Sequence, residues 1–208
     1  MALPKTAPVF LESGDRLTRA EFHRRYCARP DIKRAELIEG VVYVPSPTRL
    51  TWHDEQTAWM IGWAVAYAAR HPGVRAGSSS TIFLSDDTEV QPDAFLFRPV
   101  PVGEGPSITE RGYIDGQPQL IVEVAASSVS YDLHDKMRAY RRAGVREYVI
   151  WRVLDEAIDW FVLRDSEYLR LEPDEHGVVE SAVFPGLRLN VPKMLAGDTA
   201  GVLAELDR

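Results

Sequence analysis

The most constraining feature of this sequence is an apolar segment over 120–125 that is interrupted only by Glu123. A run of this kind is typical of a β-strand that is covered on both faces of its sheet. A serine-rich stretch, a helical pattern over 131–143 and a second apolar segment over 146–153 follow it. This order predicts a strand–helix–strand unit, and with it an α/β fold.

Hairpin patterns lie on both sides of this unit. Near the N-terminus, strands over 35–38 and 41–44 flank Glu39-Gly40, where the glycine supplies the positive φ of a tight turn. Near the C-terminus, 156–163 and 167–171 predict a second hairpin. The other predicted elements are a short helix ending near Tyr26, a long helix from about Thr48 or Leu50 to Arg70, strands over 79–84 and 89–97, and short helices within 192–206.

The length of 208 residues predicts one domain over 1–208. Within it we expect residues 1–16 to be flexible. The segment 100–118 is rich in Pro and Gly, and we expect it to form a mobile loop.

Charge and cysteine content exclude several classes of function. The chain carries 24 basic and 31 acidic residues, so a nucleic-acid site must be a local patch rather than the whole surface. The single cysteine, Cys27, excludes intramolecular disulfides and cysteine-based zinc sites. No apolar run has the length of a signal-peptide core or a membrane span, so we expect a cytoplasmic protein with no membrane partner.

Two acidic residues stand out against apolar surroundings. Glu123 is one, because an ionised carboxylate inside an apolar strand is costly unless another group compensates it. Asp93 is the other: it follows Pro92, and strand alternation places it on the same face as Phe95 and Phe97. The structural alternatives are a strand end or salt bridge for Glu123 and an ordinary Pro-Asp turn for Asp93.

Lys136 is the third candidate. At 100° per residue it lies roughly 60° from Leu133, within the apolar sector that also holds Met137 and Tyr140. The helix face that packs on the sheet therefore carries a lysine. The alternative is snorkelling, in which the stem packs and the ammonium reaches water at the helix edge.

Two carboxylates from neighbouring strands and a lysine from the crossover helix predict a site for a hard divalent cation, Mg²⁺ or Mn²⁺. Such an ion neutralises phosphate charge and activates water, and Lys136 can orient that water or stabilise the transition state of phosphodiester hydrolysis. Ser127, Ser128 and Ser130 precede the predicted helix and are candidates for phosphate contacts, or simply for its cap.

The order Pro92-Asp93 and then Glu123-Val124-Ala125 resembles the PD-(D/E)XK nuclease superfamily, although Ala125 stands where the usual lysine would be. Within that superfamily the chain is similar to the Uma-two family of restriction endonuclease-like proteins, in which the following helix supplies the lysine. The matching segments span nearly the whole chain in order: 35–40, Ser46-Pro47 with His53, 91–93, 118–124, 132–136, 140–148 and 185–187.

This resemblance implies a restriction-endonuclease-like fold, with a mixed central β-sheet flanked by helices and with N-terminal and C-terminal β-hairpins. It implies that Asp93 and Glu123 hold the metal, that the backbone carbonyl of Val124 adds a ligand, and that Lys136 is the catalytic lysine. Glu36 and His53 are implied as accessory residues that act through water or at a phosphate. An ordinary polar residue beside a hairpin and a surface histidine are the structural alternatives.

The expected function is that of a Mg²⁺- or Mn²⁺-dependent endonuclease, with DNA as the expected substrate. Two alternatives stay open: a non-catalytic module of the same fold that binds nucleic acid or protein, and a hydrolase of small phosphoesters. Contacts to DNA phosphates would rely on a few arginines, namely Arg138, Arg141, Arg142 and Arg146. A homodimer is expected, because nucleases that cut both strands commonly pair two sites, and the helix with Trp52, Trp59 and Trp63 is a candidate contact.

Overall fold

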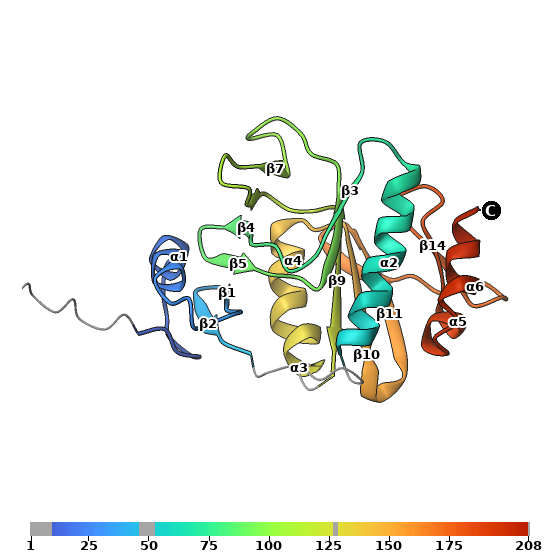
Figure 1. The fold of residues 1–208 in the computed structure, drawn as a ribbon, viewed down its shortest axis with the longest axis horizontal. Coiled ribbons are helices and arrows are strands. Elements are labelled where there is room, and N and C mark those ends of the chain that lie inside the picture. The colour runs from blue at the N-terminus through green and yellow to red at the C-terminus, as the bar shows by residue number, and fades with distance from the viewer. Residues whose placement is uncertain (1–9, 46–52, 127–128, 208) are drawn as a thin grey trace, which may run out of the picture.

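The computed structural model of this chain describes residues 10–45, 53–126 and 129–207. Within these residues the strands form two six-stranded mixed sheets and one separate antiparallel pair, β13 (Val178–Glu180) with β14 (Arg188–Asn190). Figure 1 shows the helices packed around these sheets. The predicted α/β class with a mixed sheet flanked by helices is confirmed, and the second large sheet is an addition that the sequence did not reveal.

The first sheet contains the predicted strand–helix–strand unit. The central strands β9 and β10 run parallel, with Leu120 opposite Glu147, and the other neighbours in this sheet are antiparallel. The predicted C-terminal hairpin is β11–β12. In spatial order the strands are β3 (Arg75–Gly77), β6 (Ala94–Phe97), β9 (Leu120–Ala125), β10 (Glu147–Arg152), β11 (Ala157–Arg164) and β12 (Glu167–Arg170).

The second sheet contains the predicted N-terminal hairpin, whose turn residues Glu39 and Gly40 have φ of 49° and 78°. Its last two strands lie inside 100–118, which was predicted as a loop. Residues 1–9 lie outside the described residues, whereas Leu11 is buried and Arg16 forms a bridge to Val41. The strands in spatial order are β2 (Val41–Tyr43), β1 (Glu36–Ile38), β5 (Thr88–Val90), β4 (Ile82–Ser85), β8 (Ile114–Asp115) and β7 (Ser107–Ile108).

The prediction of one continuous strand over 89–97 is wrong at its centre. β5 ends at Val90 in the second sheet, and β6 begins at Ala94 in the first. Pro92 lies between them and has no N–H to donate to a strand ladder, so the chain leaves one sheet there and enters the other. Asp93 consequently lies at the crossing between the two sheets.

The predicted helices are present, with altered ends. The long helix begins at Asp54, later than the predicted start at Thr48 or Leu50, because His53 is its non-helical N-cap residue; 46–52 lie outside the described residues. The helix predicted over 131–143 starts at Val129 and includes a π-helical turn, Asp132–Lys136, before α4. The helices are α1 (Arg19–Cys27), α2 (Asp54–Arg70), α3 (Val129–Tyr131), α4 (Met137–Ala143), α5 (Val191–Leu195) and α6 (Thr199–Leu203).

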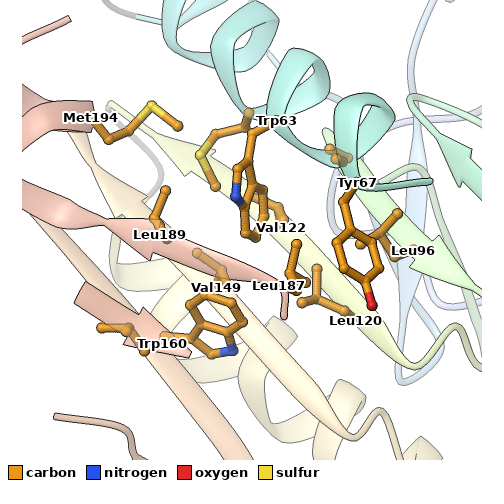
Figure 2. Packing of buried hydrophobic residues seen from close by; sticks show 14 of the residues in the cluster. Trp63, Tyr67, Leu96, Leu120, Val122, Val149, Trp160, Leu187, Leu189 and Met194 are labelled. Atoms are coloured by element: carbon orange, nitrogen blue, oxygen red, sulfur yellow. The ribbon is translucent and has the colours of Figure 1, made fainter. Parts of the chain in front are cut away.

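The two faces of β9 pack against different helices. Val122 and Val124 belong to the core under α2, where Trp63 and Tyr67 lie over the strand (Figure 2). Ile121 and Ala125 belong to the core that β9 shares with α4 and the second sheet. Since side chains alternate along a strand, this second face also receives Glu123. The fold thereby aims the one charged residue of β9 between the two sheets.

Candidate functional site

The three candidate residues lie in one buried cluster at the junction of the two sheets. Ala94 pairs with Val122 in the antiparallel register of β6 and β9, which sets Asp93 opposite Glu123 one step further along. Lys136 reaches the same place from the last position of the π-helical turn, and Glu36 comes from β1. All four side chains are buried, with relative exposures of 2–4%.

Lys136 provides the positive charge at the centre of this cluster. Its Nζ lies 2.9 Å from Oε1 of Glu123, 2.9 Å from Oε2 of Glu36 and 3.7 Å from Oδ1 of Asp132. The ammonium also lies 5.5 Å from the ring centroid of Tyr131. Burial alone would lower the pKa of Lys136, but the surrounding carboxylates raise it well above its ordinary value. Lys136 therefore points inward as a cation and does not snorkel.

Glu123 is held by two hydrogen bonds to one oxygen. Lys136 donates to Oε1, and the hydroxyl of Tyr140 donates to the same atom at 2.6 Å. Burial and, to a lesser extent, the negative charge of Asp93 raise the pKa of Glu123 to about 8 against the lowering effect of Lys136. At neutral pH, without a further cation nearby, much of this carboxyl is protonated.

Asp93 has the opposite electrostatic environment. Its Oδ1 accepts from Nη1 of Arg34 at 2.9 Å, and its Oδ2 accepts from the backbone N–H of Val124 at 2.8 Å. The Nε2 of His53 lies 3.4 Å from the same Oδ2. Burial alone would raise the pKa of Asp93, but His53 and Arg34 outweigh it and hold the pKa below its ordinary value. The hydrogen bond to Asp93 in turn raises the pKa of His53.

Sequence reasoning missed several members of this cluster. Asp132 and Tyr140 lie four residues before and after Lys136, so helical spacing could have found them. Arg34 lies two residues before Glu36, just outside β1, and its Nη2 donates to the carbonyl of Gln91 at 2.5 Å. No local pattern pointed to Arg34, because its partners are more than fifty residues away in the sequence.

Other predicted site residues lie elsewhere or cannot be placed. Ser127 and Ser128 fall outside the described residues, and Ser130 is exposed within the first helical turn. Arg138 is half exposed and pairs with Glu39 and Asp135. For Val124 the observed contact is through its N–H, whereas the predicted ligand is its carbonyl, so that role stays a prediction.

The donor set fits a hard divalent cation. Glu36, Asp93, Glu123 and Asp132 lie around the cations Arg34 and Lys136, and carboxylate oxygens are the ligands that a hard divalent cation takes. Among the described residues, no group of three or more His, Cys, Asp or Glu side chains has the arrangement of a metal site. Mg²⁺ typically takes one or two carboxylates and keeps several waters, so Asp93, Glu123 and a main-chain carbonyl would suffice.

Comparisons with known proteins bear on the fold and the family of this chain. The chain is similar to a crystal structure described as a putative nuclease belonging to DUF820 from Anabaena variabilis ATCC 29413, with a TM-score of 0.64 and 14% sequence identity. The match covers 83% of this chain and 96% of that chain, and it bears out the nuclease-like fold. A search of curated proteins gives no match. In the described part of the chain, no helix has the length and apolar character needed to cross a membrane.

A family model matches residues 19–192, a stretch that includes every described residue of the buried cluster. Because that stretch is far more than half of the chain, the protein belongs to the Uma2 family, whose description is "putative restriction endonuclease".

Proposed function

We propose that this protein is a metal-dependent endonuclease that hydrolyses phosphodiester bonds in DNA and uses Mg²⁺ or Mn²⁺. The observation that carries the proposal is the buried cluster in which Lys136 bridges Glu123 and Glu36 beside Asp93. Two acidic oxygen donors next to a fixed cation match the requirements of phosphodiester hydrolysis. Membership in the Uma2 family supports the same reaction class.

In this proposal Asp93 and Glu123 hold the ion together with the carbonyl of Val124. When bound, the ion neutralises charge on the scissile phosphate and lowers the pKa of the attacking water. Lys136 orients that water and stabilises negative charge that develops on the phosphate oxygens. Glu36 keeps Lys136 in place, since it accepts from the ammonium through Oε2 and from the backbone N–H of Gln91 through Oε1.

Substrate would approach from the side of Arg34 and His53. These two side chains are 25% and 17% exposed, whereas the residues behind them are almost fully buried. Both are cationic or can become so, and both contact Asp93, so a phosphate placed there lies next to the proposed ion. Arg34 also keeps Asp93 ionised, as a ligand must be. The exposed Ser130 and Arg138 are retained as candidate contacts to more distant phosphates.

The proposal is tested by incubating the purified protein with supercoiled plasmid, single-stranded DNA and RNA, each with Mg²⁺, Mn²⁺ or EDTA. We expect cleavage of DNA that EDTA abolishes. Asp93→Asn and Lys136→Met should each reduce the rate by about a hundredfold or more. Lys193→Met is the matched control. Lys193 also pairs with a buried carboxylate, that of Glu205, at 3.0 Å, but it lies on α5, outside the candidate site.

The same experiment separates the alternatives. Equal cleavage with and without EDTA, or equal losses in Lys136→Met and Lys193→Met, would contradict the proposal. Calorimetric titration with no Mg²⁺ or Mn²⁺ heat would favour a non-catalytic binding module. Hydrolysis of bis(p-nitrophenyl) phosphate without cleavage of any nucleic acid would favour a small-phosphoester hydrolase.

A further inference from the structure

Tyr140 makes a short hydrogen bond to Glu123 in the candidate site. Its side chain is fully buried on α4, one helical turn after Lys136, and its hydroxyl donates to Oε1 of Glu123 at 2.6 Å. Hydrogen bonds of this length from a hydroxyl to a carboxylate oxygen are among the stronger ones in proteins. The ammonium of Lys136 donates to the same oxygen at 2.9 Å. Both donors thus contact one oxygen of Glu123.

These two hydrogen bonds distinguish the two oxygens of Glu123. A carboxylate oxygen has two lone pairs, and those of Oε1 are taken by Tyr140 and Lys136. A further cation, whether a proton or a metal ion, therefore finds its lone pairs on Oε2. Asp93 lies opposite Glu123 across the register of β6 and β9, so Oε2 is the oxygen of Glu123 that the proposed ion would share with Asp93.

Tyr140 is the more rigid of the two donors. Its ring packs against the ring of Tyr148, with centroids 5.2 Å apart, within the core that also contains Ile121 and Ile150. Its backbone carbonyl accepts from the N–H of Val145 at 3.0 Å. A lysine ammonium, in contrast, ends a flexible stem and has three donors, so it can follow a carboxylate that turns. Tyr140 is thus the donor that sets the orientation of the carboxylate.

We propose that Tyr140 is a positioning residue whose hydroxyl holds Oε1 of Glu123 and thereby presents Oε2 to the divalent ion. This inference rests on the proposed function, because it concerns the same ion. Tyr140 acts through Glu123 and not on the phosphate directly. Without the hydroxyl, the terminal torsion of Glu123, which is broad by itself, is restrained by Lys136 alone. Part of the binding free energy of the ion is then used to orient the carboxylate.

Tyr140→Phe tests the proposal, because it removes the hydroxyl and keeps the ring in the core. Calorimetric titration of the metal-free protein with Mn²⁺ measures the dissociation constant of the ion. We expect Tyr140→Phe to weaken Mn²⁺ binding about tenfold, the usual effect of removing a hydrogen bond to a metal ligand. Tyr168→Phe is the matched control and should leave the affinity unchanged. It removes a hydroxyl that donates to the backbone carbonyl of Val145 at 2.9 Å, beside the same core.

A second measurement separates positioning from a loss of stability. Urea unfolding in EDTA shows how much of each variant is folded, and trimethylamine N-oxide restores the folded state of a weakened variant. We expect this osmolyte to restore the fold of Tyr140→Phe without restoring its affinity for Mn²⁺. In plasmid cleavage, the folded variant should need more Mn²⁺ to reach half of its maximal rate, and saturating Mn²⁺ should restore most of the wild-type rate.

Failure of the inference and failure of the proposed function give different results. If the wild type gives no Mn²⁺ heat and cleaves no DNA, both are wrong. If the wild type binds Mn²⁺ and a folded Tyr140→Phe binds it equally tightly, only the inference is wrong. Equal weakening in Tyr140→Phe and Tyr168→Phe, or recovery of the affinity in the osmolyte, would also overturn it, because the loss would then come from general stability.

Discussion

The ammonium of Lys136 lies close to three carboxylates in the buried cluster. Lys136 faces Glu123, Glu36 and Asp132, and the cost of removing these charges from water is only partly offset by their attraction. Burial accordingly raises the pKa of Glu123 to about 8, so that a proton supplies the missing positive charge. At the scale of single residues, a buried carboxyl that needs a proton or another cation to offset its charge is the feature that best fits a site for an added cation.

Glu123 should make the metal-free protein less stable as pH rises from about 5 to about 8. Its pKa is about 8 in the folded protein against an ordinary 4.5, so the folded state binds more protons than the unfolded state in this window. The free energy of unfolding therefore falls with rising pH, by at most about 1.4 kcal/mol per pH unit for one group. Urea unfolding in EDTA across this range measures the slope.

Glu123→Gln should flatten this dependence, because the amide stays neutral at every pH. Glu175→Gln, at a carboxylate that is 87% exposed, is the control and should leave the slope unchanged. An identical slope in the wild type and in Glu123→Gln would show that Glu123 ionises in the folded protein near its ordinary pKa.

Helical spacing determines which groups reach Glu123 from the crossover segment. Tyr140 lies one turn after Lys136 and donates to the same carboxylate oxygen. The π-helical turn Asp132–Lys136 widens the helix just before α4, a distortion often found at functional sites. α4 then ends at Gly144, whose φ of 81° closes the helix in the left-handed conformation. At the scale of elements, Gly144 therefore determines where the helix that carries Lys136 ends.

Two glycine substitutions should change stability in opposite directions. Gly144→Ala introduces a Cβ at a φ of 81° and should destabilise the protein by about 1 kcal/mol. Gly62→Ala lies inside α2, where an added Cβ meets no atom within 4 Å, and should stabilise it by about 0.5–1 kcal/mol. Chemical denaturation of both variants measures the difference, and a stabilising Gly144→Ala would contradict the assigned role of this residue in ending α4.

At the scale of the whole molecule, the candidate site depends on how the two sheets meet. Glu123 comes from the first sheet, Glu36 from the second, and Asp93 from the crossing between them. One core cluster, which includes Ile38, Val90 and Ile121, joins the two sheets beside α4. The position of one sheet against the other therefore decides whether Lys136 contacts both Glu123 and Glu36.

The expected homodimer stays a prediction. The exposed side chains of α2 indicate which residue to mutate to test it. Trp63 is buried and its indole donates to the carbonyl of Arg188, so it serves the core rather than a contact. Between its charged ends, the exposed positions of α2 are small or apolar, and Val65 is 49% exposed. We expect light scattering to give the mass of a dimer and Val65→Glu to give a monomer, with Glu175→Gln unchanged. A monomeric wild type would exclude the dimer.

Much of the fold follows from local patterns. The apolar run over 120–125, the amphipathic helix after it and the Glu39-Gly40 turn all act over a few residues, and each predicts an element that is present. The pattern over 89–97 predicts one strand where the structure has two, because both of its halves are apolar and only Pro92 marks the change of sheet. A local pattern cannot show which sheet a strand joins.

The sequence by itself determined the strand–helix–strand unit and singled out Asp93, Glu123 and Lys136 as candidates, because a charge in an apolar pattern is visible without knowledge of its neighbours. Tertiary structure alone decided that Arg34 binds Asp93 and that Tyr140 and Lys136 share one oxygen of Glu123. Periodicity is set by neighbours along the chain, whereas these contacts require strand register and sheet packing to bring together residues that are far apart in it.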